Sequence, residues 1–294
     1  MTRIDLTIHA LAPIAHNQMG ADTGNVTTFR RMQRVVGGRL IRVPVISAGA
    51  LRGVVRRALW RETFAACGLS RSVVGGPWDR LYAALANGGT IEAAETRVVP
   101  DAIRARRAAL PVLSLLGSAL YSSHMAGRLK LTHAWLDCSE LGSGGLSMHD
   151  LVTEITTVRH HDAEEQDPDV SGVGPMPTTA EVVVQGASLQ AASSVTGDLE
   201  ASAWAHGLDL VEYVGGKSGQ GNGLVRIDHT SNGAAYVAWL AEHRDEVRAA
   251  LIKLAQELGK REKKSAKKPK AAEPAEVAEQ LGDGYEGSGQ KDLF

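Results

Sequence analysis

The sequence predicts a globular α+β protein, and three observations favour this class. Hydrophobic residues make up 44% of the 294-residue chain and charged residues 22%, a balance typical of globular proteins. Residues 3–11 alternate apolar and polar side chains, which predicts a half-buried opening strand. Residues 236–258 carry apolar side chains every three or four positions, which predicts an amphipathic helix ended by Gly259.

The first third of the chain predicts a strand, a long loop, a second strand and a helix. Residues 12–38 show no clear period and predict the loop. Residues 39–46 predict the second strand, and Ser47 is a suitable N-cap for the helix that follows, which Gly68 can stop. On this helix we expect Arg52, Arg56 and Arg57 to lie largely off the apolar face.

The rest of the chain alternates helices and strands. The acidic, aperiodic stretch 158–180 predicts a protruding loop or hairpin. The residues beyond 258 are too polar to bury a core and predict disorder. The other predicted elements are helices at Pro77–Asn87 and Val112–Leu120, the latter opened by Pro111, and strands at 128–136, from Glu181 and from Leu224.

Charge is distributed unevenly along the chain. Residues 1–71 hold eleven arginines against three acidic residues, whereas residues 72–257 hold 13 basic and 23 acidic residues. A basic segment beside an acidic one suggests binding to a polyanion, and it equally suits head-to-tail self-association.

Cysteine content and hydropathy indicate in which cellular compartment we expect the protein. Cys67 and Cys138 lie far apart with no CxxC pair, which argues against a zinc site and favours a reducing cytoplasm. No apolar stretch reaches the length of a transmembrane helix, so we expect no membrane partner.

A glycine-rich segment at 215–223 contains Gly216-Lys217-Ser218, which is reminiscent of a phosphate-binding loop. The position five residues before Gly216 is Val211 rather than Gly, and a strand rather than a helix follows, so a nucleotide-binding loop is disfavoured. A tight hairpin is one alternative. We favour another, in which the loop amides approach an RNA phosphate and Lys217 supplies a charge.

Other candidates have weaker patterns. His160-His161-Asp162 lacks a partner motif for a metal, and we expect no metal and no cofactor. Asp22 could act as a general acid or base, or could be a turn residue. Met176-Pro177 could wedge between bases, or could form the tip of a turn.

The elements in order resemble the RAMP superfamily of CRISPR-associated proteins, and within it the repeated backbone (Cas-seven-like) subunit of guide-RNA effector complexes. The resemblance covers most of residues 1–230. It rests on five segments: the Gly24-Asn25 loop with Arg30-Arg31, Val43-Pro44 to Leu51-Arg52-Gly53, Ser114-Leu115-Leu116-Gly117 with Gly127-Arg128-Leu129, the strand from Glu181, and Gly215 to Gly223.

The resemblance implies a ferredoxin-like palm similar to an RNA-recognition motif. It places a RAMP palm with insertions at residues 1–257, with a helical insert at 70–125 and a thumb at 158–180. The disordered charged tail that composition predicts at 258–294 has no counterpart in the family. The resemblance further implies copies stacked along a guide RNA, with other effector subunits as partners. The residues it implies in RNA binding are Arg30, Arg31, Arg34, Arg52, Arg56, Met176 and Lys217, with Asn17 and His16 as weaker candidates.

In this reading the protein binds RNA and is not an enzyme. Arginines hold guide phosphates, and base pairing supplies specificity. We expect a type I or type IV system, with DNA preferred over RNA as the target. Two enzymatic alternatives remain: a type III-like subunit that cuts target RNA with Asp22, and a guide-processing ribonuclease that uses a loop histidine such as His16.

Overall fold

The computed structural model describes residues 1–18, 26–69, 77–90, 100–120, 123–142, 145–159 and 176–266. Its strands are β1 (Thr2–Ala10), β2 (Val26–Thr27), β3 (Arg31–Val36), β4 (Arg39–Ile46), β5 (Gly89–Thr90), β6 (Gly117–Leu120), β7 (Ser123–Ala126), β8 (Leu129–Leu131), β9 (Ala134–Leu136), β10 (Val152–Arg159), β11 (Met176–Val183), β12 (Ser188–Val195) and β13 (Val225–His229). Its α-helices are α1 (Ala48–Ala66), α2 (Pro77–Asn87), α3 (Pro100–Ala109), α4 (Pro111–Leu116), α5 (Met148–Leu151), α6 (Asp198–Asp209), α7 (Ala234–Glu242) and α8 (Arg244–Ala266).

The main sheet contains a ferredoxin-like unit. Along the chain its elements run β1, α1, β9, β12, α6 and β13, and in space the strands lie in the order β13-β1-β12-β9, with each neighbouring pair antiparallel. This is the βαββαβ arrangement with two crossover helices. Ile4, Leu6 and Ile8 of β1 are fully buried, so the predicted alternation of the opening strand is confirmed. The predicted α+β, ferredoxin-like fold is confirmed.

A hairpin of β3 and β4 extends this sheet beyond β9. Its turn is Gly37-Gly38, where both residues have positive φ angles of 56° and 79° that favour glycine. The prediction of a loop over residues 12–38 is therefore wrong at Arg31–Val36, and it is also wrong at Val26–Thr27, where β2 pairs with β11. All six residues of β3 are exposed or half-buried, so its sequence lacks the alternation that marks a strand.

The segment between α1 and β8 combines helices with a small sheet. The predicted helix at Pro77–Asn87 is confirmed as α2, while β5, β6 and β7 form a separate three-stranded sheet. The helix expected to reach Leu120 ends at Leu116, because Gly117 has a φ of +67° and packs against the backbone of Gly127. The strand expected at 128–136 is interrupted between β8 and β9.

A second hairpin pairs β10 with β11 in antiparallel register. The predicted strand at Glu181 is confirmed, and it begins earlier, at Met176. Residues 160–175 lie outside the described part of the chain, and the candidate metal cluster His160-His161-Asp162 is among them.

The single helix expected over residues 236–258 is two helices. α7 ends at Glu242, and His243, which stacks on Trp239 at a ring-centroid distance of 4.8 Å, separates it from α8. α8 then continues past Gly259 to Ala266, so the predicted helix end is wrong. Residues 267–294 lie outside the described residues.

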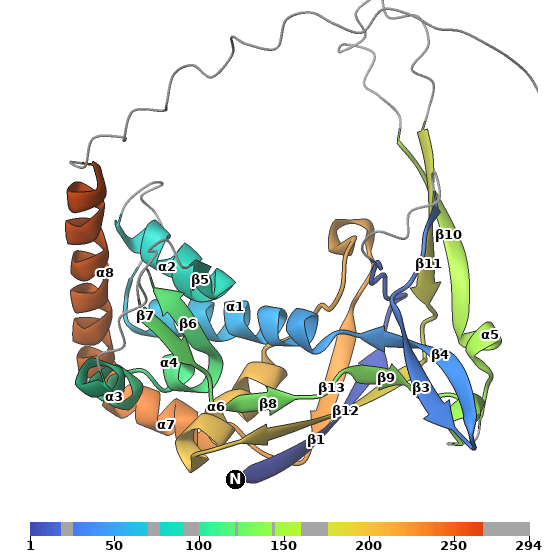
Figure 1. Cartoon of the computed structure of the whole chain (residues 1–294), viewed down its shortest axis with the longest axis horizontal. Coiled ribbons are helices and arrows are strands. Elements are labelled where there is room, and N and C mark those ends of the chain that lie inside the picture. The colour runs from blue at the N-terminus through green and yellow to red at the C-terminus, as the bar shows by residue number, and fades with distance from the viewer. Residues whose placement is uncertain are drawn as a thin grey trace, which may run out of the picture.

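Figure 1 shows how these elements are arranged. α1 runs above the main sheet, with α2 and α8 at one end of it and the β10–β11 hairpin at the other. None of the helices in the described ranges is long and apolar enough to cross a membrane.

Candidate nucleic-acid interface

The glycine-rich loop between α6 and β13 is fixed against the segment that follows β1. Gly216 N–H donates to Ala15 O (2.7 Å), and Gly223 N–H donates to Pro13 O (2.7 Å). Gly215 has a φ of +92°, and a Cβ there would lie 2.2 Å from Ala15 O. Only glycine allows this close backbone contact, so the sequence of the loop determines where the loop sits.

The tip of the loop presents free donors. Lys217 has a φ of 60°, the one positive value of a non-glycine residue in the described chain. The described residues offer no recorded acceptor to the amides of Lys217, Ser218 and Gly219. The Lys217 Nζ atom is shielded from solvent and also has no hydrogen-bond partner among them. Consecutive free amides beside a left-handed residue are typical of an anion-binding nest.

The amino terminus of α1 is capped by three side chains. The predicted N-cap is confirmed, because Ser47 Oγ accepts a hydrogen bond from Ala50 N–H. Ser47 N–H donates to His16 Nε2 (3.2 Å), and Ala48 N–H donates to His133 Nδ1 (3.1 Å). Burial, together with the charge of Arg30, lowers the pKa of His16 and favours the neutral acceptor form.

Hydrogen bonds join these segments into one surface. His16 follows Ala15, which bonds to the glycine-rich loop, and His16 O accepts from Arg30 N–H at 2.7 Å. The exposed Asn17 forms a backbone bridge to Phe29, one residue before Arg30. Of the residues expected in RNA binding, Asn17, Arg30 and Lys217 therefore lie around the start of α1.

Two arginines of α1 differ in environment. Arg52 is half-buried, its Nε has no partner in the described residues, and burial lowers its pKa. Arg56 is buried and donates to Gly117 O (2.7 Å) and Leu116 O (2.8 Å). The expectation that Arg56 lies off the buried face is wrong. Its guanidinium ties α1 to the end of α4, and burial followed by the charge of Arg52 lowers its pKa to about 10.

The remaining expected residues lie on strands. Arg31 is held by Glu181 through two hydrogen bonds of 2.6 and 3.1 Å, which connects β3 to β11. Burial opposes ionisation of Glu181, but the bonds from Arg31 and Phe29 outweigh it and lower the pKa of this carboxyl. Arg34 is exposed on β3 and lies over the Trp135 ring, 5.2 Å from its centroid. Met176 begins β11.

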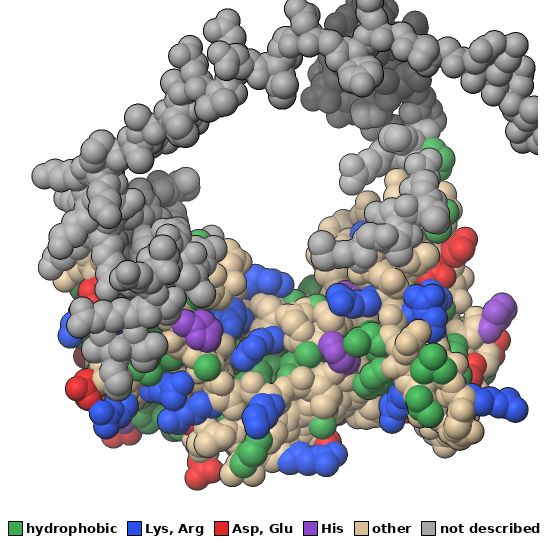
Figure 2. Space-filling view, in the orientation of Figure 1, with side chains coloured by type: hydrophobic (Ala, Val, Ile, Leu, Met, Phe, Trp, Pro, Cys, Tyr) green, Lys and Arg blue, Asp and Glu red, His purple; other side chains and the backbone are tan. Residues whose placement is uncertain are grey.

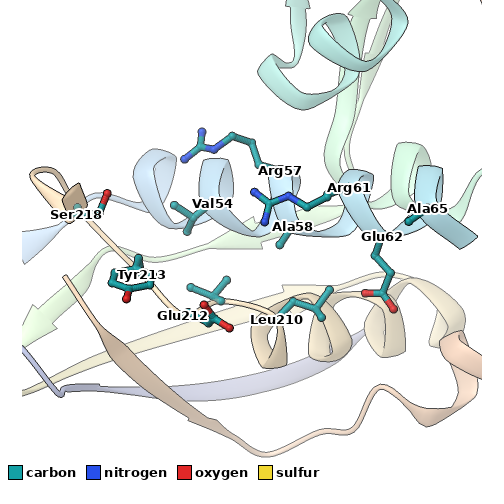
Figure 3. Close-up of a pocket in the computed structure, with 12 residues that line it drawn as sticks. Val54, Arg57, Ala58, Arg61, Glu62, Ala65, Leu210, Glu212, Tyr213 and Ser218 are labelled. Carbon is teal, nitrogen blue, oxygen red and sulfur yellow. The ribbon is translucent and has the colours of Figure 1, made fainter. Parts of the chain in front are cut away.

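The residue list from the sequence omits Arg57 and Arg61, both exposed on α1. They line a groove of about 640 Å³ between α1 and the segment that joins α6 to the glycine-rich loop. Figure 2 shows basic side chains spread over the described part of this face, several of them near its middle, and Figure 3 shows the residues of the groove. The sequence does indicate that Arg57 and Arg61 belong together, because residues four positions apart lie on one face of a helix.

The two enzymatic alternatives depend on Asp22 and on His16. Asp22 lies outside the described residues. His16 Nε2 already accepts the Ser47 amide, so this nitrogen is engaged in capping a helix. Within the described ranges, no group of three His, Cys, Asp or Glu side chains gathers as a metal site requires.

Comparison with known proteins finds similarity in structure. No family model matches the sequence, and no curated protein matches it. Among solved structures, one chain of a type IV-B CRISPR complex matches 78% of this chain and 91% of its own length, with a TM-score of 0.56 and 19% identity. The crystal structure of Thermofilum pendens Csc2 matches 92% of this chain and 90% of its own, with a TM-score of 0.40 and 17% identity. The chain therefore shares its fold with the matched chain of a type IV-B CRISPR complex.

Proposed function

We propose that this protein is a backbone subunit of a CRISPR effector complex that holds guide RNA by its phosphates. The fold shared with a chain of a type IV-B CRISPR complex supports a role in such an assembly. Copies of the subunit would lie along the RNA, together with other subunits of the complex. The guide would then pair with a target, for which we prefer DNA.

The observation that carries the proposal is the convergence of unpaired cations and free amides at the start of α1. In the described part of the chain, no ion pair is recorded for Arg30, Arg52 or Lys217, while Arg31, Arg106 and Arg128 each contact a carboxylate. The amides of Lys217 itself and of its neighbours Ser218 and Gly219 have no acceptor among the described residues. Cations and amides without internal partners are the groups that phosphate oxygens recruit.

This surface suits binding that is independent of base sequence. Its groups are point charges and backbone donors, which position a strand through its phosphates. Because each neutralised phosphate releases counterions, the affinity should fall steeply as salt concentration rises. Sequence would be read by base pairing between the guide and its target.

We further propose that the subunit does not cleave RNA. A general base needs a free lone pair near the reacting group. His16 Nε2 is already occupied by the Ser47 amide, and the lowered pKa of this histidine reflects burial and Arg30. These features favour a positioning role for His16 in the loop.

The test measures single-stranded RNA affinity of the full chain across salt concentrations. For Arg30→Gln, Arg52→Gln and Lys217→Gln, the slope of log K against log[salt] should fall by about one each, uniformly for unrelated sequences. Arg248→Gln is the matched control, because it removes the same charge from an exposed position on α8, at the far end of the molecule (Figure 1). A shallow wild-type slope, or equal effects of all four substitutions, contradicts the proposal.

A further inference from the structure

The groove beside the glycine-rich loop has two unlike walls. One wall is α1, with Val54, Arg57 and Arg61, and the facing wall carries Leu210 and Tyr213 (Figure 3). At about 640 Å³ the groove is within the size range of small-ligand sites. Ser218 also lines the groove, so it is continuous with the loop whose amides have no recorded acceptor.

Tyr213 is an exposed aromatic side chain in a fixed position. Its exposed fraction is 45%, and every other aromatic side chain whose burial the structure describes is buried or half-buried. The backbone of Tyr213 forms a bridge to Leu224, and its neighbour Val214 is buried. A ring held by its backbone and open to a groove is suited to stack against a flat partner such as a nucleobase.

The opposite wall supplies positive charge. Arg57 and Arg61 are exposed, lie one helical turn apart, and have no recorded hydrogen bond or ion pair from their guanidinium groups among the described residues. The Arg57 side chain folds back along the helix, since a Cβ on Gly53 would lie 3.5 Å from its Nη1. This direction brings its charge toward the amino-terminal end of α1.

Two carboxylates also line the groove, and they differ in availability. Glu62 Oε2 lies 2.8 Å from His206 Nε2, and Figure 3 shows its side chain directed towards α6. Glu212 is exposed, and among the described residues no hydrogen bond or ion pair reaches its carboxylate, although its backbone carbonyl accepts from Val225 N–H. A polyanion in the groove would therefore be repelled by Glu212, and neutralising this residue should strengthen its binding.

We propose that this groove is a subsite for one unstacked nucleotide of single-stranded RNA, with the base on Tyr213 and the adjoining phosphates on Arg57 and Arg61. The inference rests on the proposed function and adds an aromatic platform to a surface otherwise made of charges. An RNA strand held at the glycine-rich loop would continue into the groove past Ser218.

The experiment measures affinity for a short single-stranded RNA that contains 2-aminopurine, whose fluorescence reports stacking. Tyr213→Ala should weaken binding at least about fivefold and remove the fluorescence change, because base–aromatic stacking contributes this much or more. Tyr213→Phe keeps the ring and should bind as the wild type does. Glu212→Gln should bind more tightly, and Arg57→Gln with Arg61→Gln should lower the salt slope by about two.

The outcomes separate this inference from the proposed function. If the wild type binds RNA and responds to Lys217→Gln while Tyr213→Ala binds normally, the nucleotide subsite is wrong and the proposed function stands. If Tyr213→Ala leaves RNA affinity unchanged but prevents copies from assembling, the groove binds protein and the inference is overturned. If the wild type does not bind RNA, both fail. Thermal unfolding of each variant checks that the fold is kept.

Discussion

Two neighbouring arginines of α1 face regions of opposite character. Arg56 points into the junction with α4, where the carbonyl groups of Leu116 and Gly117 accept its hydrogen bonds. Arg57 lies on the wall of the groove beside the glycine-rich loop, where the described residues offer no recorded acceptor to its guanidinium. Both regions place an arginine of one helix against a segment that contains glycine. In the first region the protein supplies the acceptors, and in the second a ligand would have to.

The comparison shows that an excess of arginine in a segment does not measure its capacity to bind an anion. The guanidinium of Arg56 donates its hydrogen bonds to backbone carbonyl groups, and that of Arg31 donates to the Glu181 carboxylate. Such cations stabilise the fold, because a buried guanidinium is tolerated only when its donors are paired. The cations left for a ligand are those with no internal partner.

The largest expected effect is a difference in stability between two single variants, Arg56→Met and Arg57→Met. Arg56→Met leaves the carbonyls of Leu116 and Gly117 without their donor, and each unsatisfied buried group costs about 1–3 kcal/mol. We expect the free energy of unfolding to fall by about 2–4 kcal/mol in urea denaturation. Arg57→Met should change it by no more than about 0.5 kcal/mol, as is usual for exposed positions, while lowering RNA affinity.

Equal stability of the two variants would contradict this contrast. It would mean that water satisfies the carbonyls at the α1–α4 junction when the guanidinium is removed. Arg56→Lys is a further check, because lysine keeps the charge but loses the fork that reaches two carbonyls at once. We expect its stability to lie between the wild type and Arg56→Met.

A smaller effect should follow from adding a methyl group within the glycine-rich loop. At Gly215 a Cβ would lie 2.2 Å from Ala15 O in a backbone with φ of +92°, so alanine must displace the loop. We expect Gly215→Ala to cost about 1–3 kcal/mol and to weaken RNA binding. Gly219→Ala is the matched control, because a Cβ there meets no atom within 4 Å.

Hydrogen exchange of residues 214–224 measures the difference between Gly215→Ala and Gly219→Ala. Gly216 N–H, which donates to Ala15 O, should exchange faster in Gly215→Ala and at the wild-type rate in Gly219→Ala. Unchanged exchange in both variants would show that the loop position does not depend on the Ala15 contact.

Much of the palm could be predicted from the sequence, because its signals are local. Ser47 supplies a capping hydroxyl immediately before an apolar period, and β1 alternates along its length. β3 was missed because all six of its residues are exposed or half-buried, so the strand has no buried face to set a pattern. The break at His243 was missed because the apolar spacing continues on both sides of it.

The site was less predictable, since it depends on contacts between distant segments. The spacing of Arg52 and Arg56 suggested a shared exposed face. However, α1 packs against α6 and also against the inserted helices α2 and α4. A helix covered on two sides buries residues outside a single apolar stripe. Tyr213 gave no signal, because its exposure follows from how the loop is tied to Pro13 and Ala15.

The smallest effect we predict concerns His16, which joins the loop after β1 to the start of α1. Burial and Arg30 lower its pKa in the folded protein, so the unfolded chain binds this proton more readily. The stability that His16 contributes is therefore complete above its ordinary pKa of about 6.5 and is lost as the pH falls through the lower value of the folded state. His16→Gln can still accept the Ser47 amide but does not titrate, so its melting temperature should fall less than that of the wild type between pH 7.5 and 5.5. The two decreases should differ by no more than about 2 °C.

His124→Gln, at an exposed position, should keep the wild-type pH dependence. A steeper loss of stability in His16→Gln than in the wild type would show that the protonated histidine is the stable form and that the capping bond to Ser47 does not govern this junction.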